Sequence, residues 1–401
     1  MILSGLHGAV KFTQLMIKDV MKIVHIIRDI ATETGGPVSA AVGMAQAQAA
    51  HGHDVTMIAT DYGAKLMVTG DAMTLRLATC KLNAWRWAPD LHRILISALA
   101  RADVCHLHTF WEYPIWAGAR ACRNLNIPFI LSPHGMLDRW PLSQSSLKKK
   151  IYLKLLGIPV LNHAAGIHLT SERELDESEL FGNKHKGKVI ALGVPKSAYE
   201  DLPDSGAFAQ KYAILNGKKY ILFLGRLHFK KQPDLAIRAF AAAHKIHPEA
   251  VLVMAGPGEP EYVAELKSLA CELGVTDFTL FTGMLVGRTI QEAYRGAKAF
   301  ILPSLQENFG VAVAEAMAAG CPVILSDKVD LAPEVCGAEA GIVCPADVAS
   351  MSNAIGRLLT EDRLFQELGN NAQNLIRERY TWDNQAQLLE QFYQNCGGLR
   401  K

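Results

Sequence analysis

Short apolar runs alternate with helical segments along nearly the whole chain. Continuous apolar runs of this kind, separated by helices, are typical of parallel strands buried on both faces of a sheet. We expect one set of strands at 23–27, 55–59, 104–108, 129–132, 166–170 and 189–192, and a second at 220–224, 251–255, 278–282, 299–302, 323–325 and 341–343. The pattern therefore predicts the α/β fold class.

A segment rich in proline, glycine and polar residues, at about 193–219, separates the two sets of strands. We interpret it as a linker between two doubly wound, Rossmann-like domains at 21–195 and 196–378, which would face each other across a cleft. In such folds ligands lie beyond the carboxyl ends of the strands. The loops that follow the strands are therefore where functional residues are expected.

Residues 1–20 contain a weak apolar stretch that His7 and Lys11 interrupt, which makes a poor signal peptide. Met21 then opens the run MKIVHII, which has the pattern of a first strand. We therefore treat 1–20 as an N-terminal extension and expect the folded domain to begin at Met21.

The chain has 401 residues, of which 50% are hydrophobic and 20% charged, with a formal net charge of +2. This balance fits a soluble globular protein with room for two domains, and it argues against nucleic acid as a partner. The eight cysteines show no C-x-x-C spacing, which favours reduced thiols in a cytoplasmic protein. No apolar run reaches the ~18 residues of a transmembrane helix.

The most informative stretch is 300–327, FILPSLQENFGVAVAEAMAAGCPVILSD, which has the pattern of strand, loop, helix, turn and strand. Glu307 lies in the loop that leads into the helix, and Glu315 lies about one turn inside it. Backbone N–H groups near Phe309, Gly310 and Val311 would form an anion site at the helix N-terminus. Carboxylates for hydroxyl groups, beside donors for phosphate, are what a nucleotide-sugar donor requires.

A basic loop follows the first strand of the second set. The strand ends at Gly225, Arg226 comes next, and Lys230 and Lys231 precede a helix. Arg226 and Lys231 suit a diphosphate leaving group, whose developing negative charge they would neutralise. The alternative is a solvated loop.

Glycines follow two further strands of the second set. Gly256 ends one of them, and Gly283 precedes Met284 and Leu285 after the other. Because glycine leaves room, a nucleotide could approach the backbone closely at both places. Each signal is weak by itself, since most loops after strands contain glycine.

The first strand of the chain is followed by Thr34-Gly35-Gly36-Pro37. This is not G-x-G-x-x-G, so the dinucleotide fingerprint of a dehydrogenase is absent. Gly36 and the helix after it could contact phosphate or acceptor, or form a plain tight turn. In the strand at 104–108 we expect His106 and His108 to point to opposite faces, which argues against a joint metal site.

Several side chains near strand ends suggest an acceptor pocket. His108, Trp111 and Glu112 could line it. His134 comes directly after the strand at 129–132 and is a candidate for contact with the transferred sugar, with a structural histidine as the alternative.

The segment 147–157, LKKKIYLKLLG, is basic and amphipathic. Together with Trp140 just upstream it fits peripheral contact with a membrane surface. A solvated helix face is the alternative.

The chain resembles glycosyltransferase family 4, the retaining enzymes of the GT-B fold, in the segments GRLHFKK, AGPGE, FTGML, LPSLQENFGVAVAEAMAAGCPVILSD and YTWDNQAQLLEQFY. The likeness covers essentially the whole chain from Met21. It implies an acceptor-binding domain at 21–195, a nucleotide-sugar-binding domain at 196–378, and a helix at 379–401 that crosses back to the first domain.

The resemblance also implies roles for single residues. Catalytic roles at the transferred sugar and the diphosphate fall to Glu307, Lys231, Arg226 and His134. The donor would be bound along Gly36, Gly225, Gly256, Met284, Leu285, Asn308, Phe309, Gly310, Val311 and Glu315. Among these, Glu307 would bind hydroxyls of the sugar, Glu315 hydroxyls of the ribose, and Met284 and Leu285 would flank the base.

Two positions depart from the family pattern. Asn308 stands where the family more often has glycine, and because asparagine tolerates unusual backbone angles we expect a change in donor choice rather than a loss of activity. Gln232-Pro233 stands where Gly-Ile is common, which should matter little.

The reaction that the resemblance implies is retaining transfer of a hexose-type sugar from a UDP- or GDP-linked donor to a glycan or lipid-linked acceptor, without a further cofactor. The sequence has no D-x-D metal motif, so Arg226 and Lys231 would meet the phosphate charge. The expected setting is polysaccharide synthesis for the cell envelope, in the cytoplasm or at the periphery of the inner membrane face. The alternatives are a catalytically inactive nucleotide-sugar-binding protein and a sugar-nucleotide epimerase.

Overall fold

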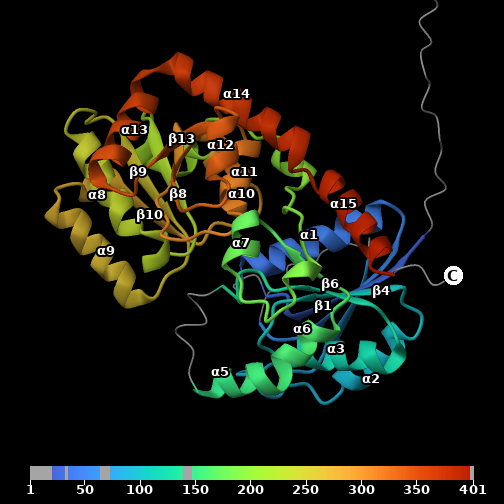
Figure 1. Ribbon diagram of the computed structural model, residues 1–401. Coiled ribbons are helices and arrows are strands. Elements are labelled where there is room, and N and C mark those ends of the chain that lie inside the picture. The colour runs from blue at the N-terminus through green and yellow to red at the C-terminus, as the bar shows by residue number, and fades with distance from the viewer. Residues whose placement is uncertain (1–19, 32–34, 64–72, 139–146, 398–401) are drawn as a thin grey trace, which may run out of the picture.

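The computed structural model describes residues 20–31, 35–63, 73–138 and 147–397, which form two lobes (Figure 1). Two features of the sequence, most of the extension at 1–20 and Trp140, lie outside the described residues.

Among the described residues, the first lobe is built on a seven-stranded parallel sheet in the order β3-β2-β1-β4-β5-β6-β7. Its strands are β1 (Lys22–Asp29), β2 (Asp54–Thr60), β3 (Thr74–Ala78), β4 (Val104–His108), β5 (Phe129–Ser132), β6 (Gly166–Leu169) and β7 (Gly187–Val189). Its helical segments are α1 (Gly36–Ala50), α2 (Leu91–Leu99), α3 (Tyr113–Leu125), α5 (Leu147–Tyr152), the π-helical turn η2 (Leu153–Gly157), α6 (Ile158–His163), α7 (Glu172–Glu177) and the 3₁₀ turn η3 (Lys184–Lys186).

The second lobe holds a six-stranded parallel sheet in the order β10-β9-β8-β11-β12-β13, again within the part of the chain that is described. Its strands are β8 (Tyr220–Leu224), β9 (Val251–Ala255), β10 (Thr279–Gly283), β11 (Ala299–Leu302), β12 (Val323–Ser326) and β13 (Gly341–Cys344). Its helices are α8 (Pro233–His244), α9 (Pro260–Glu272), α10 (Arg288–Gly296), α11 (Val311–Ala318), α12 (Ala332–Gly337), α13 (Val348–Thr360) and α14 (Asp362–Arg379), with 3₁₀ turns η7 (Phe229–Lys231) and η8 (Thr276–Phe278).

Both sheets follow the same path, in which three strands run outward in one direction and the next strands run in the other. The reversal falls between β1 and β4 in the first sheet and between β8 and β11 in the second. In doubly wound sheets this reversal opens a crevice at the carboxyl ends of the strands, where ligands bind. The predicted α/β class is confirmed, and each lobe has one such position.

Two edge strands of the first sheet differ from the prediction. β3 was not expected, because its half-exposed sequence TLRLA carries Arg76 and lacks a continuous apolar run. β7 lies at 187–189 and not at 189–192. An edge strand has a neighbour on one side only, so its residues need not be apolar throughout.

The predicted linker is folded. It contains the 3₁₀ turns η4 (Lys196–Ala198), η5 (Ala209–Lys211) and η6 (Ala213–Leu215). Phe208 and Leu215 are fully buried, and the Phe208 ring packs on Tyr212 and Tyr220. The segment is therefore part of the second lobe's packing, while the exact domain boundaries stay a prediction.

The helix α15 (Trp382–Asn395) leaves the second lobe and lies on the first beside α1 (Figure 1). Thr381 forms a parallel bridge with Val194, which brings the two connections between lobes together. The indole of Trp382 occupies the space that a side chain at Gly43 of α1 would need, and it also lies against Gly193. Farther along, Glu390 pairs with His51 at 2.6 Å.

The first sheet has two differently covered faces. Val24 and Ile26 belong to a core with α2, α3 and α6, whereas Ile23 and Ile27 belong to the core on the α1 side. Alternate residues of a strand point to opposite faces, so the odd-numbered positions of β1 face α1 and α15. No helix among the described residues is long and apolar enough to cross a membrane.

Candidate active site

Glycine residues lie at the carboxyl ends of β8, β9 and β10 in the second sheet. The N–H of Gly225 donates to the carbonyl of Ala255 at 3.0 Å, and the N–H of Gly256 donates to the carbonyl of Gly283 at 2.8 Å. A Cβ on Gly256 would collide with the carbonyl oxygen of Gly225. This end of the sheet therefore offers backbone, without side chains, to a bound ligand.

The loop after β11 lies against the basic loop after β8. The N–H of Leu305 donates to the carbonyl of Lys230 at 2.8 Å, and the ammonium of Lys231 forms an ion pair with the carboxylate of Glu307. Burial, and then the charges of Arg226 and Lys230, lower the pKa of Lys231 to about 8. Lys231 thus stays largely protonated at neutral pH, and the structure brings it together with Glu307 as two of the predicted catalytic residues.

Glu307 is also held by its own backbone. It forms a parallel bridge with Val329, and the N–H of Asp330 donates to its carbonyl at 3.0 Å. The side chain is therefore presented from a loop that is fastened on two sides.

The helix α11 begins where the sequence predicts it. Gly310 is its N-cap residue with a φ of 76°, a left-handed conformation that favours glycine. Phe309 is buried, and its ring packs on Tyr380 at 5.6 Å between centroids. The first N–H groups of the helix, from about Val311, have no carbonyl partner inside the helix and can bind an anion.

Glu315 lies on the second turn of α11. The hydroxyl of Tyr294 donates to its carboxylate at 3.4 Å. Burial raises the pKa of Glu315 to about 7. A carboxylate that accepts from a hydroxyl therefore lies on the turn behind the helix start, and its role as a ribose contact stays a prediction.

The predicted base-flanking residues are accessible. Met284 is 44% exposed, Leu285 is half-buried, and Val286 beside them is 61% exposed. Arg226 is also exposed. The apolar side chains of Met284, Leu285 and Val286, at the end of β10, leave a surface on which a planar base could lie.

From the first lobe, the loop that carries His134 and Gly135 reaches the loop of Asn308 after β11. His134 and Gly135 both have left-handed backbone, with φ of 51° and 72°. A Cβ on Gly135 would lie 2.5 Å from Nδ2 of Asn308, so the two loops touch. Nδ2 of Asn308 is buried and has no hydrogen-bond partner among the described residues. The structure thus brings the loop that carries His134 next to Asn308, one of the predicted donor residues.

A buried carboxylate fixes the loop that carries His134. Glu174 of α7 accepts from the N–H of Gly135 at 2.6 Å and from the N–H of Thr170 at 2.7 Å. Ser171 caps α7 by accepting from the N–H of Glu174. The S-x-x-E pattern was legible in the sequence as a capping box, but it does not reveal that Glu174 holds Gly135.

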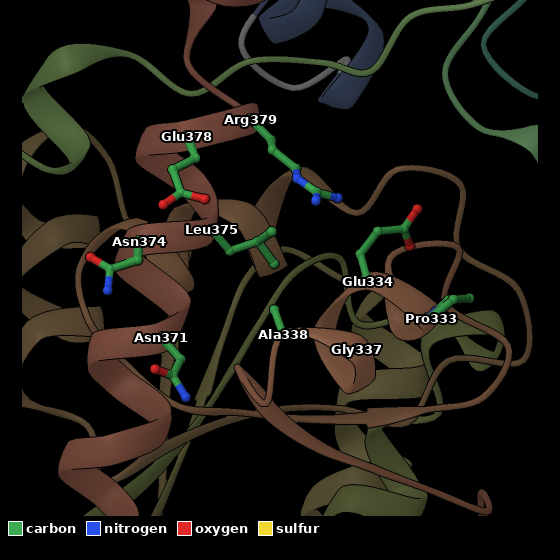
Figure 2. A pocket seen from close by; sticks show the side chains of 9 residues that line it. All are labelled: Pro333, Glu334, Gly337, Ala338, Asn371, Asn374, Leu375, Glu378 and Arg379. Atoms are coloured by element: carbon green, nitrogen blue, oxygen red, sulfur yellow. The ribbon is translucent and has the colours of Figure 1, made fainter. Parts of the chain in front are cut away.

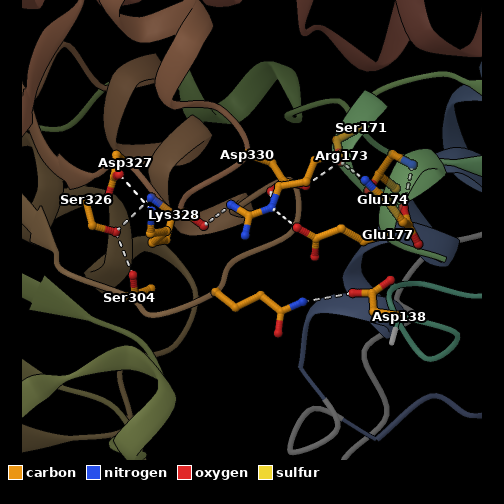
Figure 3. Close-up of polar contacts among 12 residues, drawn as sticks. Asp138, Ser171, Arg173, Glu174, Glu177, Ser304, Ser326, Asp327, Lys328 and Asp330 are labelled. Atoms are coloured by element: carbon orange, nitrogen blue, oxygen red, sulfur yellow. Dashed lines mark hydrogen bonds and ion pairs between the residues drawn. The ribbon is translucent and has the colours of Figure 1, made fainter. Parts of the chain in front are cut away.

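Polar contacts link the lobes beside this site (Figure 3). Gln306 donates to Asp138 at 3.0 Å, Ser171 donates to Asp330, and Arg173 donates to the carbonyl of Lys328 at 3.2 Å. The sequence contained no signal for these pairs, because their members lie far apart along the chain.

Two carboxyl groups of this boundary titrate near neutrality. Burial, and then the charge of Glu174, raise the pKa of Asp138 to about 7. Burial also raises the pKa of Asp330 to about 6. The contact between the lobes is therefore sensitive to pH in the neutral range.

The expectation that His106 and His108 point to opposite faces is wrong. Their rings stack at 4.3 Å between centroids, because residues two apart in a strand share a face. With His25 of β1 they form a group whose nitrogen atoms lie within 4.8 Å of one another. The ring nitrogens of His106 already pair with Tyr393 at 2.6 Å and Ser132 at 2.7 Å, so a metal ion would have to displace those partners.

The predicted acceptor residues have different neighbours. His108 is fully buried and pairs with His134, so it lies behind that residue and lines no open pocket. Trp111 packs on Tyr152 at 5.5 Å between ring centroids. Glu112 accepts from Arg28 at 2.9 Å.

Gly36 begins α1 and is exposed, with open space around it. A cavity of about 550 Å³ lies between α12 and α14, with Glu334 and Arg379 on opposite sides (Figure 2). None of the predicted site residues lines that cavity.

Comparison with known proteins identifies the family of the chain. Residues 204–375 match the sequence model of the family described as glycosyl transferases group 1, and residues 35–193 match that of the glycosyl transferase 4-like domain. The two matches fall on the two lobes in turn.

Curated relatives are named as glycosyltransferases. A D-inositol 3-phosphate glycosyltransferase of Xylanimonas cellulosilytica is 31% identical over 303 residues, which cover 73% of this chain and 71% of that protein. An uncharacterized glycosyltransferase of Methanocaldococcus jannaschii is 28% identical over 297 residues, covering 73% of this chain and 75% of its own length.

Among solved structures, Anabaena HepE in complex with UDP superimposes with a TM-score of 0.77 at 19% identity, covering 94% of this chain and 100% of that chain. The same protein has also been solved with UDP-glucose. At this identity the likeness shows a shared fold, and it confirms the GT-B architecture expected from the sequence.

Proposed function

Because this chain belongs to the glycosyl transferases of group 1, we propose that it moves a hexose-type sugar, with retention of configuration, from a UDP- or GDP-linked donor to a glycan or lipid-linked acceptor. One relative is named as a D-inositol 3-phosphate glycosyltransferase and another, from Streptococcus pneumoniae, as an alpha-monoglucosyldiacylglycerol synthase, so these relatives act on different acceptors. HepE binds UDP and UDP-glucose.

The observation that carries this proposal is the pairing of Lys231 with Glu307 at the strand reversal of the second sheet. A cation for the diphosphate and a carboxylate for sugar hydroxyls lie next to each other, just before the helix start at Gly310. In the ion pair the two charges neutralise each other. A bound donor would give Lys231 a phosphate partner and leave Glu307 to accept from the sugar.

The proposed reaction takes place on one face of the sugar. The bond from the anomeric carbon to the diphosphate oxygen breaks, the acceptor oxygen forms the new bond on the same face, and the departing diphosphate takes the acceptor's proton. Such a reaction needs charge neutralisation and positioning more than a protein nucleophile. Lys231 and the exposed Arg226 supply the positive charge, which makes metal-independent transfer the expected form.

On the acceptor side we propose contact with an anionic membrane surface through 147–157. Leu147, Ile151 and Leu155 recur every four residues and are 74%, 51% and 64% exposed. Lys149 and Lys150 lie between them, and residues with this spacing share one face of a helix. An exposed apolar stripe with lysines beside it is the pattern of helices that lie in a membrane interface, where a lipid-linked acceptor would be found.

A panel of nucleotide sugars, with UDP and GDP, tests the donor proposal by thermal shift and then by donor hydrolysis. A ligand that binds only the folded protein raises the unfolding midpoint by mass action. One base should shift the midpoint, Glu315→Ala should abolish that shift, and Glu361→Ala, which changes an exposed glutamate of the same lobe, should preserve it.

Three outcomes would favour the alternatives. No shift with any nucleotide would favour a protein that has lost donor binding. Binding without transfer or hydrolysis would favour a catalytically inactive binding protein, and interconversion of the sugar without an acceptor would favour an epimerase.

Vesicle co-sedimentation tests the membrane proposal. Vesicles with anionic lipid should bind the wild-type chain, and neutral vesicles should bind it less. The triple variant Leu147→Ser, Ile151→Ser, Leu155→Ser should lose this binding, whereas Ile246→Ser, which removes a 77% exposed side chain from the other lobe, should not. Equal binding by the triple variant would show that the helix face is simply solvated.

A further inference from the structure

A layer of buried polar side chains lies under α1 and α15 on one face of the first sheet. It contains His25, His106, His108 and His168 of the central strands, all 0% exposed. Ser132 of β5, Gln48 of α1 and Tyr393 of α15 complete it. Burying so many polar groups is unfavourable unless each finds a hydrogen-bond partner.

The side chains form one unbranched hydrogen-bonded chain. It runs from His134 to His108 (3.3 Å), His25 (2.9 Å), Gln48 (2.7 Å), Tyr393 (3.1 Å), His106 (2.6 Å), Ser132 (2.7 Å), His168 (2.8 Å) and the carbonyl oxygen of Ile190 (2.8 Å). Each imidazole between the ends uses both of its nitrogens.

The carbonyl of Ile190, at one end of the hydrogen-bonded chain, determines which atom donates in every bond. The far half is the part from Ile190 to Tyr393. The carbonyl of Ile190 can only accept, so Nε2 of His168 carries the proton and Nδ1 accepts. Ser132 must then donate to His168 and accept from Nε2–H of His106. Nδ1 of His106 is left as an acceptor, so the hydroxyl of Tyr393 donates to it.

The near half is the part from Tyr393 to His134, and its donors and acceptors are fixed in the same way. The hydroxyl proton of Tyr393 is used in the hydrogen bond to His106, so its oxygen accepts from the amide nitrogen of Gln48. The amide oxygen of Gln48 then accepts from Nε2–H of His25. Nδ1 of His25 accepts from Nε2–H of His108, whose own Nδ1 must accept from Nε2–H of His134.

One arrangement of protons therefore satisfies every group, and in it all these imidazoles are neutral. The surroundings favour neutral rings, because burial lowers the pKa of His25 and His168 to about 4 and that of His134 to about 3. Burial is likewise the largest cause of the lowered pKa values of His106 and His108.

We propose that this hydrogen-bonded chain positions His134 for transfer by holding its proton on Nε2, so that Nδ1 is the acceptor it offers to a hydroxyl of the bound sugar; this rests on the function proposed above. His134 and Gly135 meet the loop of Asn308, and no described residue hydrogen-bonds to Nδ1 of His134. The other members of the chain are positioning residues, since they act through His134.

Two other uses of this layer fit less well. A relay that exports a proton needs a terminal group that can take it up, and the chain ends on a backbone carbonyl. A metal ion on His25, His106 and His108 would need lone pairs that the chain already uses.

Tyr393 is the member that the rest of the chain depends on. It comes from α15, which the second lobe sends back, and its hydroxyl joins the two halves. Without it, His106 loses its donor and Gln48 loses the acceptor that orients its amide.

The first test measures the protons directly and needs no enzymatic activity. Nitrogen NMR of histidine-labelled protein should show the Nε2–H tautomer for all these rings, with His134 assigned by its loss in His134→Ala. In Tyr393→Phe the signals of His25, His108 and His134 should report mixed tautomers. An Nδ1–H ring, a charged ring or a bound metal in the wild-type protein would overturn the assignment.

The second test separates positioning from simple packing. Tyr393→Phe should lower kcat about ten-fold, the worth of one hydrogen bond, with KM for the donor within about two-fold. In a His134→Ala background the same change should alter kcat less than about two-fold, because its target is gone. An equal loss in both backgrounds would mean that Tyr393 acts on the fold alone.

Control variants complete the design. Tyr220→Phe removes an equally buried hydroxyl, which donates to the carbonyl of Ala293, and should leave kcat unchanged. Ser132→Ala interrupts the far half and should reproduce the effect of Tyr393→Phe if that variant folds poorly. A wild-type chain without transferase activity would defeat the proposed function, and the NMR result would still decide whether the hydrogen-bonded chain exists.

Discussion

The two sheets share one strand order but have different interiors. The strands of the second sheet are almost wholly apolar, and its site consists of backbone and of charges at the strand ends. The first sheet carries histidines in the middle of β1, β4 and β6, on the face toward α1 and α15. The same topology therefore supports a dry core in one lobe and an ordered polar layer in the other.

In the proposed reaction, the two lobes would therefore contribute in two different ways. A charged side chain in a loop that follows a strand, such as Lys231, can act directly on a phosphate. A buried neutral layer can only orient a group at its end, here His134. We therefore expect the two lobes to respond differently to mutation.

The largest effect is expected from Lys231→Ala. Losing the ammonium beside the departing diphosphate should lower kcat/KM by about 10²- to 10³-fold. His134→Ala should cost about ten-fold, since it removes one neutral hydrogen bond. Steady-state kinetics with the donor identified by thermal shift would measure both.

The control for this pair is Lys184→Ala, which breaks an exposed ion pair with Asp176 in the first lobe. It should leave the kinetics unchanged. A larger loss from His134→Ala than from Lys231→Ala would contradict the division of roles between the lobes.

Gly256→Ala tests the tight backbone of the second sheet. Its Cβ would collide with the carbonyl of Gly225, and its φ of 138° is unfavourable for alanine, so the free energy of unfolding should fall by more than about 2 kcal/mol. Gly217→Ala, which has a φ of 68° but open space, should cost about 1 kcal/mol. Urea denaturation compares the two, and equal losses would mean that the strand ends are not tightly packed.

The last prediction concerns the boundary between the lobes. The pKa of Asp138 is raised from 3.8 to about 7, so the folded state binds this proton more tightly than the unfolded state. Its contribution to stability is present below about 3.8 and is lost as the pH rises through about 7. Asp138→Asn should therefore flatten the dependence of the unfolding midpoint on pH between these values.

The matching control for the pH series is Asp176→Asn, which removes an exposed carboxylate of the same lobe. Its midpoint should follow the wild-type pH dependence. An Asp138→Asn curve that also follows the wild type would place the pH sensitivity elsewhere.

Local patterns were enough to predict most of the strands and the positions of the loops that carry the predicted donor residues. The site residues at 300–327 and Arg226–Lys231 lie in continuous stretches, so their spacing alone indicates a strand, an anion-binding helix start and a basic loop. The half-exposed edge strand β3 has no such pattern and was missed.

Contacts between distant segments were not predictable from one sequence. Gln306 with Asp138, and Tyr393 with His106, are 168 and 287 residues apart. Their pairing depends on how the lobes and α15 pack, which no local spacing encodes. The misassigned faces of His106 and His108 are a different case, because a period of two already places them together.

The return of α15 to the first lobe also has a consequence for synthesis. Gln48 meets Tyr393 345 residues later in the chain. A ribosome releases the first sheet long before α15 exists, so for most of translation its α1 face has neither Trp382 nor Tyr393 to cover it. Contacts of such sequence separation form slowly. The lobe that is made first therefore gains the cover of its α1 face only after the C-terminal helix has been made.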